Sequence, residues 1–189
     1  GVGKTTTAVN LATSLANDFD KKVLLIDGNL SSPNLGLHLG LKETPTSLND
    51  VLNDKIIVSE AIYQHEYGFH ILPSSLKAKP VNISKLKNKI SNLRKYYDYI
   101  IMDSSPTAKQ ELQAVMGASD KLFVVSNPDK VTMAMTLRAI NLAKEKKVPI
   151  LGLILNKVRN KKYELNTEEI EHFSSVPILA SIRDSTRML

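Results

Sequence analysis

The strongest constraint on this chain comes from its first six residues, Gly1 to Thr6, which read GVGKTT. They match the second half of the phosphate-loop pattern G-x-x-x-x-G-K-[ST], with Gly3 as the second glycine. Glycine lets backbone N–H groups approach an anion closely, and the lysine and hydroxyl that follow can contact phosphate oxygens and Mg²⁺. Because such a loop joins a strand to a helix, the motif predicts an α/β fold.

The pattern also bears on the ends of the chain. The first glycine of the pattern, and the strand before it, belong upstream of Gly1, and no helix stop signal precedes Leu189. We therefore expect a fragment that is truncated at both ends and has its first strand missing. Loss of that strand leaves unpaired backbone groups at its neighbours in the sheet.

Apolar runs alternate with helical patterns along the rest of the chain. The runs are nearly continuous, which is typical of strands buried on both faces of a parallel sheet. Their alternation with helices predicts a doubly wound α/β fold, with a mostly parallel sheet and helices on both faces. The expected strands are 23–26, near 68–72, 99–102, 122–125, 150–155 and 177–180, and the expected helices are 5–16, 84–93, 109–118 and 131–146, with short helices within 35–67.

Length and composition fit a single globular domain. A chain of 189 residues is close to the usual domain size, so we expect residues 1–189 to form one P-loop domain. No apolar run approaches the ~20 residues that cross a bilayer. Cysteine is absent, which excludes disulfides and thiolate metal sites. The net charge of +6 favours partners that carry phosphate, without choosing among them.

Polar residues stand where the expected strands end. In doubly wound sheets, ligands bind outside the carboxyl ends of the strands. Asp103 follows four apolar residues, as the Mg²⁺-binding aspartate of a Walker B strand does, and Asp27 has the same placement. The alternative interpretation of either residue is a cap after a strand. We expect Lys4, Thr5 and Asp103 to converge on one magnesium triphosphate. The strand-end residues are Asp27, Asp103, Asn127 and Asn156.

Each residue of the phosphate-loop motif has an expected contact. Lys4 places its ammonium against the β- and γ-phosphates, and the Thr5 hydroxyl coordinates Mg²⁺. Thr6 reaches the α-phosphate, and the following helix points its N-terminus at the same anion. The alternative interpretation is a glycine-rich turn before a helix. The residues expected to bind the nucleotide here are Gly1, Val2, Gly3, Lys4, Thr5 and Thr6.

Four segments resemble the deviant Walker A ATPases of the MinD/ParA family, and its archaeal MinD-like branch most closely. They read GVGKTTTAVNLA, VLLIDGNLSSPNLGLHLGL, YDYIIMDSSP and LNKVRNKKYEL, and they lie in order over nearly the whole chain. The resemblance implies an ATP-dependent switch with ATP and Mg²⁺ as cofactors. Two subunits would enclose two ATP molecules, and hydrolysis would release them. The extra lysine of the family loop falls two positions before Gly1, outside this sequence.

The resemblance also implies roles for residues away from the loop. Segments 29–36 and 103–107 correspond to switch I and switch II, which sense the γ-phosphate. Asn156 matches the asparagine that recognises adenine, since its amide can donate and accept at once; a turn-forming role is the alternative. Asp184 belongs to a segment that passes near the base. The catalytic residues implied are Lys4, Asp27 and Asn29.

One departure from the family pattern bears on catalysis. The strand before switch I usually ends Asp-x-Asp, whereas this chain has Asp27-Gly28-Asn29. A neutral Asn29 can orient a water but cannot accept its proton as a carboxylate does. Because phosphoryl transfer depends mostly on positioning and electrostatics, slow hydrolysis can survive. We therefore expect weak ATPase activity and a long-lived ATP state.

Four functions fit these features. The first is a MinD-like switch that positions division or surface machinery, and the second is a ParA-type partition ATPase that binds DNA without sequence preference. The others are a nucleotide-binding scaffold with little hydrolysis and a tyrosine kinase domain, in which Ser31-Ser32 replaces the usual arginine pair. Basic residues relevant to DNA are Lys85, Lys87, Lys89, Arg94, Lys95, Lys157, Arg159, Lys161 and Lys162.

The resemblance further implies partners and location. We expect an ATP-dependent homodimer and a regulatory or cargo protein that the sequence does not identify. Membrane attachment would use a C-terminal amphipathic helix outside this chain. The expected location is the cytoplasm, with peripheral attachment to the inner face of the cell membrane as a further possibility.

Overall fold

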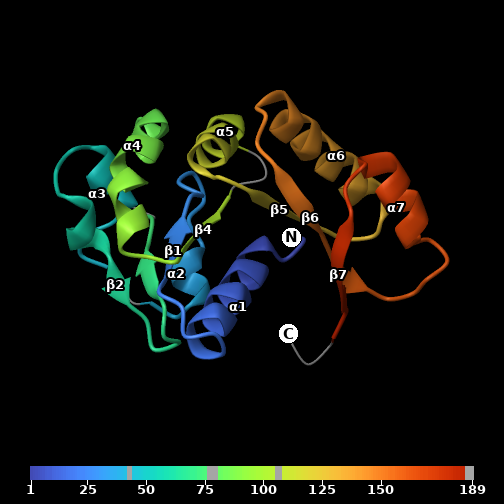
Figure 1. The fold of residues 1–189 in the computed structure, drawn as a ribbon, viewed down its shortest axis with the longest axis horizontal. Helices are drawn as coiled ribbons and strands as arrows, with labels where there is room; N and C mark the ends of the chain where they lie inside the picture. Colours follow the sequence, from blue (N-terminus) through green and yellow to red (C-terminus); the bar gives the residue numbers. More distant parts are fainter. Residues whose placement is uncertain (42–43, 76–80, 105–107, 186–189) are drawn as a thin grey trace. The chain divides into compact units, whose positions relative to one another are not determined.

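The computed structural model describes residues 1–41, 44–75, 81–104 and 108–185. The chain forms two compact units, one of residues 4–118 and one of residues 1–3 together with the chain from Ser119 onward. Each unit has its own sheet, of four and of three strands (Figure 1). No helix in the described part of the chain is both long and apolar enough to span a bilayer.

The unit of residues 4–118 is built on a sheet with the strand order β2-β3-β1-β4. The central strand β1 pairs in parallel with β3 and β4, and the short strand β2 pairs antiparallel with β3. Its elements are α1 (Lys4–Asn17), β1 (Val23–Asp27), α2 (Leu35–His38), α3 (Leu48–Leu52), η1 (Val58–Ala61), β2 (Tyr63–Gln64), β3 (His70–Leu72), η2 (Ile83–Lys85), α4 (Leu86–Ile90), η3 (Ser91–Lys95), β4 (Tyr99–Asp103) and α5 (Lys109–Ala118).

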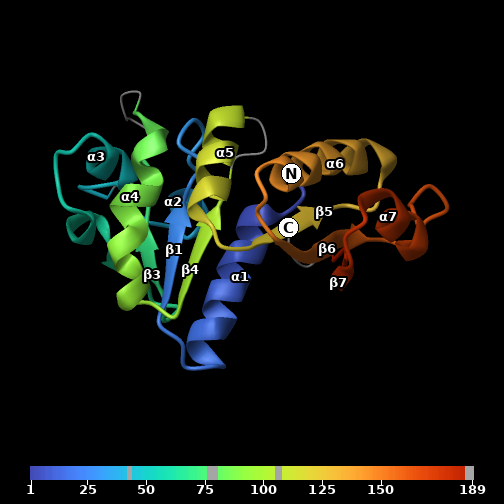
Figure 2. The ribbon, with the colours of Figure 1, turned by 45° about the horizontal axis from the view of Figure 1, so that its top comes forward.

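Strand β1 is the centre of this unit, since all five of its residues are buried. Leu24 and Ile26 belong to an apolar cluster that α3, α4 and α5 complete. Val23 and Leu25 belong to a second cluster, with residues of α1 and α2. Figure 2 shows α4 and α5 running alongside β1 and β4. Successive side chains of a strand point to opposite faces, so helices cover both faces of this sheet, as the apolar runs predicted.

The second unit has three parallel strands in the order β5-β6-β7. Helices α6 and α7 contribute Met133, Ile140 and Ile170 to one core cluster with Leu153 and Leu155 of β6. Five of the six residues of β7 are exposed, so burial on both faces was a wrong prediction for this strand. Strand β7 lies at the edge of its sheet, and its residue Ile178 is the one that packs against the cluster formed with α6 and α7. The elements are β5 (Leu122–Ser126), α6 (Lys130–Glu145), β6 (Ile150–Val158), α7 (Thr167–Ser174) and β7 (Ile178–Arg183).

The predicted fold class is confirmed, because parallel-dominated sheets are flanked by helices. The expected helix over 84–93 is instead η2, α4 and η3 in succession, since apolar residues at spacings of three and four suit either kind of helix. Helix α7 was missed, although Asn166 and Glu169 form a capping box at its start. Strand β2 was missed because it has only two residues.

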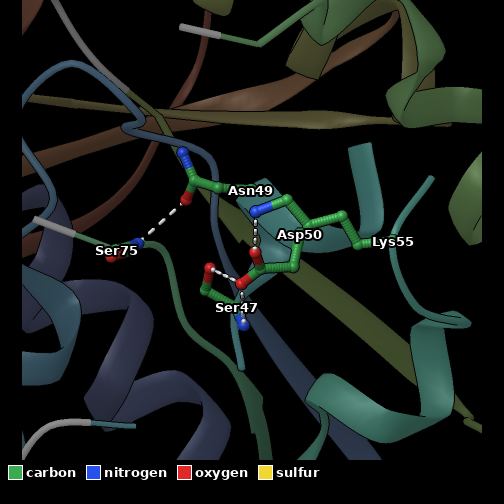
Figure 3. A network of polar contacts seen from close by, with 5 residues as sticks. All are labelled: Ser47, Asn49, Asp50, Lys55 and Ser75. Atoms are coloured by element: carbon green, nitrogen blue, oxygen red, sulfur yellow. Dashed lines mark hydrogen bonds and ion pairs between the residues drawn. The ribbon is translucent and has the colours of Figure 1, made fainter. Parts of the chain in front are cut away.

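A polar network fixes α3 to the chain that follows β3 (Figure 3). The Ser47 N–H donates to Asp50 Oδ2 at 3.2 Å as part of a capping box at the start of α3, and the Ser47 hydroxyl donates to the same oxygen at 2.9 Å. The Lys55 ammonium pairs with Asp50 Oδ1 at 3.0 Å. The Oδ1 atom of the buried Asn49 accepts the Ser75 N–H at 2.9 Å. The neighbouring Ser74 hydroxyl donates to the Asp27 carbonyl oxygen at 2.6 Å, so the chain after β3 is also held at the end of β1.

Candidate functional site

The phosphate-loop motif leads directly into α1, which begins at Lys4. Gly3 has a φ of +90°, a conformation that L side chains rarely adopt. Gly3 and Asn156 belong to the same unit, and a Cβ at Gly3 would lie 2.2 Å from Asn156 Nδ2. Both the backbone angle and this close approach therefore require glycine. At Gly1 a Cβ would meet nothing within 4 Å, so no described neighbour requires glycine there.

The first turn of α1 meets the end of β4. The Thr5 hydroxyl donates to Asp103 Oδ2 at 2.6 Å, although the two residues are 98 positions apart. Asp103 is 4% exposed and ends its strand, as the sequence predicted. Thr5 Oγ1 also lies 3.4 Å from Asn34 Oδ1. The structure thus brings together the two side chains that were predicted to bind Mg²⁺.

Lys4 and Asp103 influence each other's charge. Burial lowers the pKa of Lys4, and the Asp103 carboxylate offsets part of this effect. Burial raises the pKa of Asp103, against which the Thr5 hydrogen bond and the Lys4 charge act. A hydroxyl and a carboxylate are the oxygen ligands that Mg²⁺ prefers, and an ammonium suits phosphate oxygens. The side chains of these three residues are therefore of the chemical types that bind a magnesium nucleotide.

Asp27 makes backbone contacts of the kind expected for its alternative role, a cap after a strand. It is fully buried and lies opposite Asp103 in the β1–β4 register. Its Oδ1 accepts the Asn29 N–H at 3.1 Å, and its Oδ2 accepts the Leu35 N–H at 3.2 Å. Burial raises the pKa of Asp27 to about 7, against the effect of these backbone hydrogen bonds. Asp27 thus closes the loop between β1 and α2, and its catalytic role stays a prediction.

The side chain of Asn29 points into the loop between β1 and α2. The residue is 7% exposed, and its Nδ2 donates to the Ser32 carbonyl oxygen at 2.5 Å. Its Oδ1 is buried and accepts no hydrogen bond from the described residues. The side chain therefore shapes segment 29–36, the predicted switch I, and its contact with an attacking water stays a prediction.

Two further predicted residues lie in the second unit. Asn156 Nδ2 donates to the Val2 carbonyl oxygen at 2.9 Å, across 154 positions of sequence. Asp184, directly after β7, accepts from Arg159 Nε at 2.6 Å. Asn156 therefore holds the backbone of the phosphate loop, a contact that no local sequence signal indicates. Recognition of the base by Asn156 and Asp184 stays a prediction.

The predicted roles of Thr6 and of switch II have less structural support. Thr6 lies in the first turn of α1, and its carbonyl oxygen accepts from Asn10 Nδ2 at 2.8 Å. Its contact with the α-phosphate stays a prediction. In the predicted switch II, residues 105–107 lie outside the described residues.

Several of the basic residues considered for DNA binding form ion pairs. Lys85 and Lys89 both pair with Asp54. Arg159 pairs with Asp184, as described above. These contacts neutralise part of the positive charge at both clusters, which weakens the case for a continuous DNA-binding surface.

Comparisons with known proteins agree with this geometry. The sequence matches the family described as AAA domain over residues 1–153, a range that runs through the boundary between the two units. An ATP-binding protein of Methanocaldococcus jannaschii is 33% identical over 185 residues, which are 96% of this chain and 70% of the relative.

Two solved structures are also similar. The septum site-determining protein MinD of Pyrococcus horikoshii OT3, complexed with Mg-ADP, has a TM-score of 0.89 and 29% identity. The match covers 98% of this chain and 77% of that chain. A chain of the MinC:MinD cell division protein complex of Aquifex aeolicus has a TM-score of 0.86 and 28% identity, with 99% and 78% covered.

The raised pKa of Asp27 predicts a pH dependence of stability. Between about pH 4 and pH 7 the folded state keeps a proton that the unfolded chain has lost, so the free energy of unfolding falls as pH rises. From pH 5 to pH 8 this contribution is roughly 2–3 kcal/mol. Urea unfolding at both pH values should show that Asp27→Asn loses this part of the decline, while the exposed Asp20→Asn keeps it. Identical declines in both variants would contradict the assignment.

The contact between Asn156 and Val2 predicts an effect on nucleotide affinity. Asn156→Asp keeps the shape of the side chain but replaces the donor with a carboxylate oxygen facing the Val2 carbonyl oxygen. We expect the Kd for Mg-ATP to rise about tenfold, since a lost hydrogen bond with an unpaired acceptor costs about 1–3 kcal/mol. Calorimetric titration measures this, with the exposed Asn160→Asp as a control of equal charge change. Equal effects of the two variants would show that charge alone is responsible.

Proposed function

Because the chain belongs to the MinD/ParA family of P-loop ATPases, we propose that it is an ATP-binding switch protein that hydrolyses ATP slowly and dimerises around it to position division or surface machinery. The observation that carries the proposal is the 2.6 Å hydrogen bond between Thr5 and Asp103. It joins the first turn of α1 to the carboxyl end of β4, where ligands bind in such sheets.

The chemistry of the site supports ATP and Mg²⁺ as its ligands. Thr5 and Asp103 would hold Mg²⁺, and Lys4 would hold the phosphates. Bound Mg²⁺ supplies neutralisation of the charge on the phosphate oxygens. The N-terminus of α1 adds backbone N–H groups that favour an anion. The Mg-ADP in the Pyrococcus horikoshii relative supports the same ligand class.

The family also supports a proposal for partners and location. Assembly of a similar chain in a MinC:MinD complex supports binding of a regulatory protein, and the family resemblance supports an ATP-dependent homodimer. By the same resemblance, we propose that the protein works in the cytoplasm and attaches reversibly to the inner face of the cell membrane. The tyrosine kinase alternative is not favoured, because the similar proteins are MinD-type and ATP-binding proteins.

Substitution of Lys4 tests the proposal directly. We expect Lys4→Ala in the full-length protein to weaken Mg-ATP binding about 10–100-fold, because a charged hydrogen bond contributes about 1.5–3 kcal/mol. Calorimetric titration measures this loss, and the exposed Lys21→Ala serves as the control. Equal affinities of wild type and Lys4→Ala would refute the site. Binding by the wild type with no measurable turnover would favour the scaffold function.

Asn29 provides a second test, now of hydrolysis. If the missing carboxylate limits turnover, Asn29→Asp should raise kcat about tenfold or more, since a positioned general base contributes about 10²–10⁴-fold. The same change removes the donor to Ser32, so we also expect a loss of about 1–3 kcal/mol in the free energy of unfolding. The turnover assay therefore needs a temperature well below the Tm of the variant. The exposed Asn53→Asp is the control, and equal rates of wild type and Asn29→Asp would rule the idea out.

A further inference from the structure

Helix α5 carries a buried carboxylate, Glu111, in its first turn. The residue is 8% exposed, and its Oε1 accepts the Ser31 N–H at 2.9 Å across 80 positions of sequence. Its Oε2 is also buried and accepts no hydrogen bond from the described residues. Burying a carboxylate with so few partners is costly, so the contact with Ser31 calls for an explanation beyond stability.

The same helix contacts the loop between β1 and α2 at a second point. A Cβ on Gly28 would lie 2.7 Å from Val115 Cγ2 and 2.7 Å from the Asp103 carbonyl oxygen. Gly28 N–H donates to that carbonyl oxygen at 2.8 Å. Glu111 and Val115 are four positions apart, so they lie on one face of α5. The start of the loop is therefore packed between this face and the end of β4.

The other polar contacts of the loop mostly stay close to it in sequence. Asp27 accepts the Asn29 and Leu35 N–H groups, and the Asn29 amide donates to Ser32. These bonds set the internal shape of the loop but do not connect its middle to the rest of the unit. The Glu111 carboxylate makes such a connection at Ser31, two residues after Asn29, and Thr5 Oγ1 of α1 contacts Asn34 near the end of the loop.

We propose that Glu111 is a positioning residue for ATP turnover, which seats the loop carrying Asn29 on α5. This inference rests on the proposed ATPase function. Strand β4, which ends at Asp103, is followed after five intervening residues by α5, so one stretch of chain joins the expected Mg²⁺ ligand to the helix that contacts the loop. Loss of the Glu111 contact leaves Lys4 and Thr5 in place but frees Asn29 from its position. Binding of ATP is therefore kept while the chemical step slows.

A pair of Glu111 variants tests this inference. Glu111→Gln keeps a carbonyl oxygen that can accept the Ser31 N–H, whereas Glu111→Ala removes the acceptor. We expect Glu111→Ala to speed hydrogen exchange at the Ser31 amide at least tenfold and to lower kcat about tenfold, with KM for ATP changed less than threefold. Glu111→Gln should restore exchange and kcat to within about threefold of the wild type. Gln110→Ala, an exposed change on the same helix, should match the wild type.

Each other outcome overturns the inference. Unchanged exchange at Ser31 in Glu111→Ala would show that the contact does not hold the loop, and a Gln variant as impaired as the Ala variant would show that acceptance of the N–H is not the role. If Glu111→Ala fails to fold, Glu111→Gln with slow turnover would still refute it. Absence of Mg-ATP binding by the wild type would instead refute the proposed function, while exchange in nucleotide-free protein still tests the contact.

Discussion

The parallel pairing of β1 with β4 is the constraint on which the candidate site depends. The two strands are in register over their whole length, so Asp27 and Asp103 end at the same level. Because β1 is buried on both faces, this pairing cannot shift without exposing an apolar surface. The register places Gly28 where its N–H donates to the Asp103 carbonyl oxygen, and it holds Asp103 at the edge of the sheet where the Thr5 hydroxyl of α1 donates to its side chain.

Asp27 and Asp103 are both buried at this edge of the sheet, but their carboxylates contact different groups. Both pKa values are raised by desolvation, yet Asp27 uses both oxygens for backbone N–H groups of the following loop. Asp103 instead faces a hydroxyl and an ammonium, which are the groups expected around a magnesium nucleotide. Two aspartates with the same sequence context thus differ in chemistry because their neighbours differ.

The loop after β1 carries the neutral side chain of Asn29 and is held by a carboxylate from α5. Asn29 is fixed by Asp27 and Ser32, and Glu111 reaches the same loop from α5. The proposed slow hydrolysis would have its physical basis in the neutral amide of Asn29, which cannot accept the proton of a water as a carboxylate does, while the Glu111 contact would keep the loop in position. A long-lived ATP state would suit a switch that must persist before it resets.

The sequence by itself determined the class of fold and the position of the phosphate loop, because apolar runs and glycine spacing are local signals. It also placed Thr5 and Asp103 together, since both lie at the edge of the sheet where ligands bind. Only the tertiary structure revealed the contacts of Asn156 with Val2 and of Glu111 with Ser31. Such bonds join residues 154 and 80 positions apart, and nothing in the residues around either partner encodes the other. They arise once packing has brought distant segments within a few ångströms, because a buried N–H or carbonyl group must then find a partner.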